Sequence, residues 1–293
     1  MIKKTVCFLF LTMLVLWHAV SFADTSVWVA SAGGHKVYLG GTIHMLRAWD
    51  FPLPAEFDQA YQKSSIIVFE TELGKLKHAR QRQIERSTFT YHDGRTLDQV
   101  LSHKAYMTLM GYSEKIGVPV SRLHPFKPSI AVAALQSVEM QRNGMTENGV
   151  DFHFYERAVA DGKITRGLAS VDEHLKYLAE EADGDEDDYV IHAIKEFKRM
   201  TMMFSQMVSM WREGDATSID QFSIAELKTT YPKLYDRLLV ERNRTWMPII
   251  ESYFKTPATE FILVGAAHLA GEHGLLKQLA ERGYTIDRVH ADH

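Results

Sequence analysis

The 293-residue chain contains one cysteine, Cys7. A single thiol excludes an intramolecular disulfide and any metal site built from several cysteines. The chain also lacks an excess of basic residues. It has 33 Lys and Arg and 37 Asp and Glu, which give a formal net charge of −4. Proteins that bind nucleic acid need basic patches to neutralise phosphates. We therefore expect no nucleic-acid partner.

Several common catalytic motifs are also missing from the sequence. It has no Walker loop and no Gly-x-Gly-x-x-Gly, which argues against a nucleotide cofactor. It has no His-Glu-x-x-His of the common zinc proteases and no Gly-x-Ser-x-Gly of the serine α/β-hydrolases. The overall composition, with 46% hydrophobic residues, is that of an ordinary globular protein.

Only one long apolar run occurs, at residues 6–20, after Lys3 and Lys4 and before Ala23. This layout is typical of a secretory signal peptide at residues 1–23. The alternative is a membrane anchor, but the run is shorter than the roughly 20 residues that span a bilayer. We expect a mature domain at residues 24–293 that is periplasmic or secreted, with no membrane partner after cleavage. The mature chain would contain no cysteine, which suits an oxidising compartment.

The mature chain has strand-like patterns at both ends and mostly helical patterns between them. Strands are expected at residues 26–30, 36–39, 65–69, 163–168, 260–264 and 285–289, and short helices at residues 53–57 and 274–282. The sequence therefore predicts a single α/β domain. Its central mixed sheet is built from both chain ends, with a large, mostly helical insertion at about residues 75–255.

One stretch within the insertion is rich in methionine. Its members are Met200, Met202, Met203, Met207 and Met210. Methionine adapts to irregular core gaps, so core packing is the favoured interpretation. The alternative is a pliable surface for peptide substrates.

Gly-x-x-His follows two strand-like runs at opposite ends of the chain, with Gly41 before His44 and Gly265 before His268. Chance alone gives about one such spacing for 18 Gly and 14 His, so two are no evidence by count and the signal is their context. In open α/β sheets, ligands bind at the carboxyl ends of strands. Glycine there lets the backbone approach a substrate closely, and histidine can bind a metal or carry a proton.

A third apolar run ends in a carboxylate, Glu70. Two imidazoles and one carboxylate with open coordination positions form a catalytic metal set. His44, Glu70 and His268 are therefore a candidate site in which a divalent metal generates hydroxide from bound water. The alternative is that both histidines are satisfied residues of the core or of loops.

Residues 40–44, 68–72 and 264–271 together resemble the TraB/PrgY/GumN family. That family includes the TIKI proteins and is distantly similar to erythromycin-esterase and ChaN-like proteins. The resemblance covers about residues 27–290, including central segments at residues 149–158 and 241–247. One departure follows the strand expected at residues 163–168, where the family usually has Leu-Glu-Thr and this chain has Leu168-Ala169-Ser170, with His174 further on.

The resemblance implies a metal-dependent hydrolase. TIKI-like members are described as metalloproteases that prefer manganese or cobalt, and zinc is also possible here. PrgY-like members reduce peptide pheromone activity. On this basis His44 and His268 would bind the metal, and Glu70 would be a ligand or the general base. Arg242 would clamp substrate or an oxyanion, and Asn243 would orient the site. Glu72 is the rival of Glu70, because it faces the same way on an extended chain.

Three functions are consistent with these observations. The first is a metallopeptidase-like hydrolase that acts on a peptide or small-molecule substrate in the periplasm or outside the cell. The second is a metal-free, esterase-like hydrolase in which a histidine is the base. The third is a non-catalytic protein that sequesters a peptide or small ligand.

Overall fold

The computed structural model describes residues 25–81 and 86–291. The predicted signal peptide lies outside the described residues. Within them, no helix combines the length and the apolar character needed to cross a bilayer.

A six-stranded mixed sheet forms the centre of the molecule, with the strand order β6-β4-β7-β2-β1-β8. The strands are β1 (Val27–Ala32), β2 (His35–Thr42), β4 (Ile66–Thr71), β6 (Ile164–Ala169), β7 (Glu260–Gly265) and β8 (Thr285–Arg288). Strands β6, β4, β7 and β2 are parallel, whereas β1 is antiparallel to both β2 and β8. A two-stranded sheet pairs β3 (Leu46–Arg47) with β5 (Met145–Thr146).

The α/β class and the mostly helical insertion are confirmed. The α-helices are α1 (Ala55–Lys63), α2 (Leu73–Gln81), α3 (Arg86–Phe89), α4 (Leu97–Val100), α5 (His103–Lys115), α6 (Pro128–Arg142), α7 (Val150–Ala160), α8 (Val171–Glu180), α9 (Glu186–Arg212), α10 (Ala216–Ile219), α11 (Ala225–Thr230), α12 (Pro232–Tyr235), α13 (Glu241–Tyr253), α14 (Ala266–Leu269) and α15 (Leu275–Glu281). Two π-helical turns, at Asp220–Ile224 and Asp236–Val240, adjoin α11 and α13. The insertion also contributes β6, so the sheet draws on the middle of the chain as well as on its ends.

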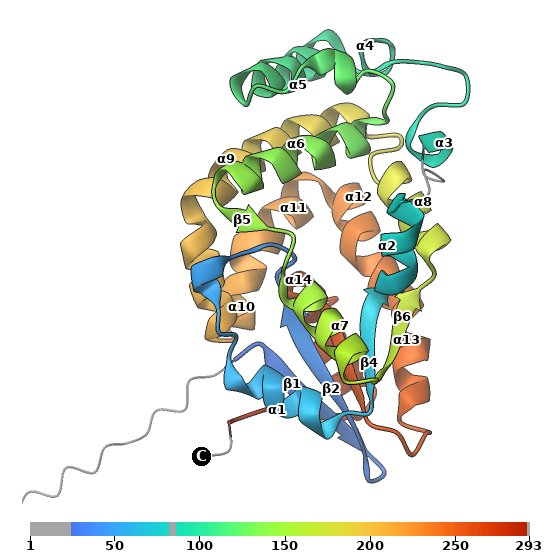
Figure 1. Ribbon diagram of the computed structural model, residues 1–293, viewed down its shortest axis with the longest axis vertical. Coiled ribbons are helices and arrows are strands. Elements are labelled where there is room, and N and C mark those ends of the chain that lie inside the picture. Colours follow the sequence, from blue (N-terminus) through green and yellow to red (C-terminus); the bar gives the residue numbers. More distant parts are fainter. Residues whose placement is uncertain (1–24, 82–85, 292–293) are drawn as a thin grey trace, which may run out of the picture.

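Alternating side chains of the central strands feed two separate cores. Phe261 and Leu263 of β7 belong to a core that includes residues of α1 and α7, while Ile262 and Val264 belong to a core that includes α13 and α15. A strand covered on both faces buries every side chain, which explains why β4 and β7 are continuous apolar runs. The result is a sheet sandwiched between helical layers, with α1 and α7 in front of it in Figure 1.

A helical lobe stands at the carboxyl-end edge of the parallel strands, at the top of Figure 1. Its core joins α4, α5, α6 and the first half of α9, with Leu109, Leu135 and Phe197 among its buried residues. The second half of α9 descends to the sheet, where Trp211 donates from Nε1 to the carbonyl of Gly41 at 2.6 Å. Helix α9 therefore connects the lobe to the sheet.

Candidate functional site

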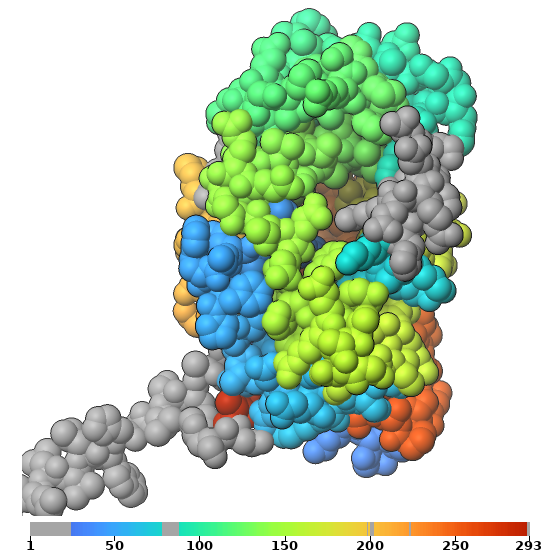
Figure 2. Space-filling view, viewed as in Figure 1, coloured from blue at the N-terminus to red at the C-terminus, as the bar shows by residue number. Residues whose placement is uncertain are grey.

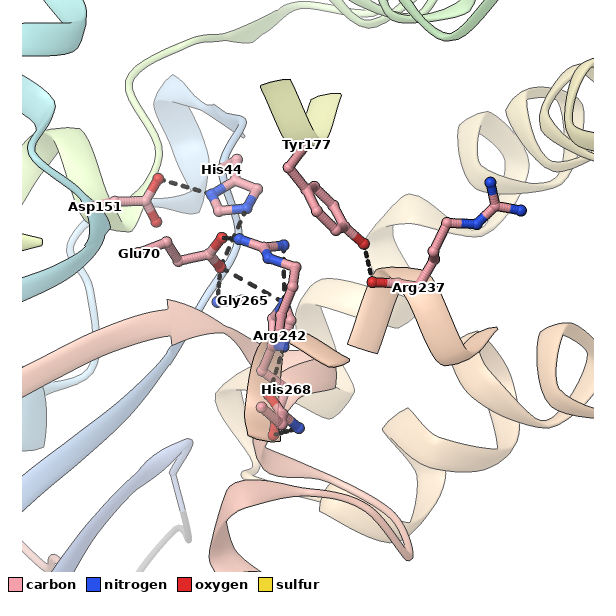
Figure 3. Close-up of polar contacts among 9 residues, drawn as sticks. His44, Glu70, Asp151, Tyr177, Arg237, Arg242, Gly265 and His268 are labelled. Atoms are coloured by element: carbon pink, nitrogen blue, oxygen red, sulfur yellow. Dashed lines mark hydrogen bonds and ion pairs between the residues drawn. The ribbon is translucent and has the colours of Figure 1, made fainter. Parts of the chain in front are cut away.

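Three neighbouring parallel strands carry polar residues to one edge of the sheet. Glu70 is the penultimate residue of β4, His44 follows the end of β2 by two residues, and His268 lies in α14 directly after β7. Register pairs Thr42 with Gly265 across β2 and β7, so these strand ends coincide. Figure 3 shows the side chains turned toward one another at this edge. The predicted convergence of His44, Glu70 and His268 is present in the structure.

Glu70 is at the centre of this arrangement, with its side chain 11% exposed. Its Oε1 accepts from the backbone N–H of Gly265 at 2.8 Å, and its Oε2 accepts from Nη2 of Arg242. The same Oε1 lies 3.9 Å from Nε2 of His44 and 4.0 Å from Nε2 of His268. Burial opposes ionisation, but Arg242, the two histidines and the N–H of Gly265 together outweigh it and hold the pKa of Glu70 well below its usual range.

His268 is buried and has both ring nitrogens engaged. Its Nδ1 lies 2.8 Å from Oδ1 of Asn243, and its Nε2 lies 3.1 Å from Nη1 of Arg242. Asn243 donates from Nδ2 to the carbonyls of His268 and His273, so its oxygen must face the imidazole and accept from Nδ1–H. Burial lowers the pKa of His268 to about 3, so this ring is neutral at physiological pH. Asn243 therefore contacts His268 through both its side-chain oxygen and its side-chain nitrogen, and its orienting role stays a prediction.

His44 has one ring nitrogen held and the other open. Its Nδ1 lies 2.8 Å from Oδ2 of Asp151, and its side chain is 61% exposed. The charge of Asp151 raises the pKa of His44 to about 9. The carboxylate thus fixes the proton on Nδ1, and Nε2 points toward Glu70 and open space (Figure 3).

Asp151 reaches His44 because helix α7 begins directly against the His44 backbone. Val150 donates its N–H to the carbonyl of Ile43 at 3.1 Å. A Cβ placed on the preceding Gly149 would lie 2.2 Å from the carbonyl oxygen of His44. Only glycine permits this approach, which sets Asp151 in the first turn of α7 beside the imidazole.

Arg242 lies in the first turn of α13 and forks between Glu70 and His268. Its guanidinium also lies over two aromatic rings, 5.0 Å from the centroid of Tyr177 and 4.5 Å from that of Trp246. The side chain is 18% exposed. Arg242 is therefore held in place by a carboxylate, an imidazole and two rings.

The predicted metal site does not fit this arrangement. Glu70 and His268, two of the three predicted ligands, both contact the Arg242 cation, through Oε2 and Nε2. Among the described residues, no group of three or more His, Cys, Asp or Glu is arranged to hold a metal ion. A divalent cation bound by these atoms would need Arg242 to move away first.

The other predicted residues lie at or near the edge. Gly265 supplies its N–H to Glu70 and lines the site, whereas Gly41 packs against Ala266 and bonds Trp211. Glu72 lies beyond the end of β4 and pairs with Lys75 at 2.7 Å. Glu72 was a rival of Glu70 because side chains two residues apart on a strand face the same way. The strand ends at Thr71, so this does not apply to Glu72.

Three residues of the site were not predicted from the sequence: Asp151, Tyr177 and Trp246. Asp151 offered one signal, because it lies directly after Gly149-Val150 in a segment that resembles the family. Trp246 offered the same kind of signal, because it lies in the segment at residues 241–247 that resembles the family. Tyr177 offered none, since an aromatic residue on a helix usually indicates core packing.

The site opens into a cavity of about 650 Å³, which we call the chamber. It lies between the sheet edge and the helical lobe, and Figure 2 shows the surface hollowed below α6 and above α7. His44, Glu70, Asp151, Arg242 and His268 all line it. His174, which stands in the departure from the family pattern, lines it as well.

Comparison with known proteins agrees with the resemblance noted in the sequence. The sequence model of the TraB/PrgY/gumN family matches residues 26–288. The chain therefore belongs to the TraB/PrgY/gumN family. No curated protein and no solved structure matches it.

Proposed function

We propose that this protein is a hydrolase of a carbonyl compound, a peptide or a small ester, in which His44 activates water. The observation that carries the proposal is the His44–Asp151 pair beside Glu70 at the floor of a ligand-sized chamber. A histidine with one nitrogen held by a carboxylate and the other facing a cavity has the geometry of a general base.

The water has a place between two acceptors. The 3.9 Å gap between Nε2 of His44 and Oε1 of Glu70 is too long for a direct hydrogen bond, and a water donating to both atoms bridges such a gap. Neutral His44 takes one proton from this water at Nε2 while the oxygen attacks the carbonyl carbon. The imidazolium is stabilised by Asp151 and then returns the proton to the leaving oxygen or nitrogen as the bond to carbon breaks.

Arg242 supplies the positive charge near the reacting atoms. A guanidinium has five N–H donors, and Glu70 and His268 take one from each Nη atom. Remaining donors can stabilise the oxyanion of the tetrahedral intermediate, and because Arg242 is already fixed, no reorganisation is needed during the reaction. His268 holds Arg242 through an uncharged nitrogen, so it adds no second positive charge beside the guanidinium.

A metal-dependent hydrolase is the second candidate. It is favoured by the distances of 3.9 and 4.0 Å that separate the two histidines from one oxygen of Glu70. Manganese, cobalt or zinc would require Arg242 to release Glu70 and His268.

Hydrolysis assays on the mature protein with ester and fluorogenic-peptide panels test the proposal. After exhaustive chelation, wild-type protein should keep its activity and the His44→Gln variant should lose it by at least about a hundredfold. Activity that disappears on chelation and returns with manganese, cobalt or zinc supports the second candidate. Equal hydrolysis rates in wild type and His44→Gln contradict both candidates. A protein that binds a peptide or ester and shields it from other hydrolases, without cleaving it, is a sequestering protein.

We also propose that the protein acts in the periplasm or outside the cell. This rests on the pattern of residues 1–23 and on the absence of cysteine from residues 24–293. Fractionation of cells that express the whole chain, with N-terminal sequencing of the product, tests it. A chain that begins at Asp24 in the exported fraction is the expected result.

A further inference from the structure

The walls of the chamber differ from its floor. The floor carries the charged residues of the site, whereas the walls are formed by apolar side chains from four helices and a π-helical turn. These wall residues are Leu73 and Leu76 of α2, Ala133 and Met140 of α6, Leu178 of α8, Phe204 and Met207 of α9, and Leu238 and Leu239 of the π-helical turn. Among the described lining residues of these helices, the polar side chains are Gln136 and Ser137 of α6 and His174 of α8.

Such walls suit a hydrocarbon better than an extended peptide. A peptide carries an N–H and a C=O group at every residue, and each one buried without a partner costs free energy. The strands at the floor cannot supply partners, because β4 and β7 each already pair on both sides. An alkyl chain makes no such demand and gains from burial against Leu, Met and Phe side chains.

The charge of the lining also restricts the ligand. Among the lining residues that the structure describes, Arg242 is the one Lys or Arg, and it already pairs with Glu70. Asp151 and Glu147 add further negative charge, which His44, with its pKa raised to about 9, offsets in part by its pairing with Asp151. Each cation that the described part of the lining carries thus already has a carboxylate partner, so a free carboxylate gains little there, whereas a neutral ester or amide meets no repulsion.

We propose that the substrate is a neutral ester or amide of an aliphatic carboxylic acid, whose alkyl chain occupies the chamber. This inference rests on the proposed hydrolase function and names its substrate class. The carbonyl group lies beside His44, and the chain extends between α6 and α9. The methionine-rich stretch takes part through Met207, because an unbranched thioether adapts to chains of different lengths. The acid product is repelled by the carboxylates of Glu70, Asp151 and Glu147, which favours its release.

Binding of methyl alkyl ketones tests the inference separately from catalysis. These ketones carry the carbonyl and the chain but no bond that hydrolysis can break. Calorimetric titration of the wild-type protein should show affinity rising about fourfold with each added methylene group until the chamber is full. Affinity that does not change with chain length overturns the inference.

Two residues of α9 provide a matched pair of variants. Met207→Asp places a charge on the chamber wall and should abolish the dependence on chain length. Met202→Asp changes a side chain that is 79% exposed and outside the chamber, and should leave the dependence of affinity on chain length unchanged. Ser137→Phe narrows the chamber from α6 without a charge and should cut off the longer ketones alone, which guards against misfolding of Met207→Asp.

The outcomes separate this inference from the proposed function. Length-dependent ketone binding without hydrolysis of any ester, amide or peptide supports the chamber as an alkyl site and contradicts the hydrolase. Hydrolysis of acetyl esters at rates equal to those of octanoyl esters supports the hydrolase and overturns the inference. Cleavage of fluorogenic peptides with no turnover of octanoyl esters also overturns it.

Discussion

His44 and His268 lie on either side of Glu70, at 3.9 and 4.0 Å from the same oxygen, yet their proton affinities are shifted in opposite directions. His44 contacts a carboxylate, which raises its pKa to about 9, while His268 is buried against Arg242 and its pKa falls to about 3. Two groups whose pKa values are shifted in opposite directions are suited to separate roles. His44 is the residue that can exchange a proton, and His268 is a neutral support for Arg242.

Replacing Glu70 should show how strongly the site depends on its charge. Glu70→Gln leaves the guanidinium of Arg242 buried without a counter-charge, and breaking a buried pair in this way costs about 3–5 kcal/mol of unfolding free energy. Urea denaturation measures the effect. Glu281→Gln, which removes one partner of an exposed pair with Lys277, is the control and should change little. Equal values for the two variants would show that Arg242 does not need Glu70.

At the scale of elements, the site is assembled by the first turns of two helices that meet the ends of the strands. Helix α7 brings Asp151 to His44, and α13 brings Arg242 to Glu70. The strand ends were predictable, because apolar runs that stop at a polar residue mark the carboxyl edge of a parallel sheet. The approach of α7 was not predictable, since it depends on contact between residues more than a hundred positions apart.

Gly149 controls that approach. Gly149→Ala places a Cβ against the backbone of His44 and should destabilise the protein by about 1–3 kcal/mol. Gly111→Ala, in α5, meets nothing within 4 Å and should stabilise the protein by about 0.5–1 kcal/mol. Thermal denaturation compares the two variants. A neutral Gly149→Ala substitution would mean that α7 does not press against His44.

For the whole molecule, the α/β class, the strands and the helical insertion followed from hydrophobic periodicity. Local pattern could not place distant residues such as Glu70 and Arg242 in one site, and only the resemblance to a family did so. The predicted metal trio shows how far such a prediction from sequence reaches. Its members do converge, but Arg242 lies between Glu70 and His268, and a residue's position between two others is a property of the packed fold.

The buried neutral His268 should make the stability of the whole molecule depend on pH. Its pKa is about 3 in the folded state and near 6.5 when unfolded, so below about pH 6.5 the unfolded chain binds a proton that the folded chain does not. Stability should therefore fall as pH drops from about 6.5. His44 has the opposite sign, with a contribution present below about 6.5 and lost as pH rises through about 9. Solvent screening makes the contribution of His44 the smaller one.

Urea denaturation of wild type and His268→Gln at several pH values measures this dependence. Between about pH 6.5 and pH 4.5, the free energy of unfolding should fall less in the variant than in the wild type. The same slope in both proteins would contradict a buried neutral imidazole at this position.

The pH dependence of kcat/KM in wild type and Asp151→Asn tests most directly the claim that the His44–Asp151 pair activates water. The assay uses whichever ester or peptide of the panels is hydrolysed. In wild type, kcat/KM should rise with pH to an apparent pKa near 9, because His44 must be neutral to accept a proton. In Asp151→Asn, the rise should move toward about 6.5, the ordinary value for histidine, with a lower plateau. Identical profiles in the two proteins would contradict the account.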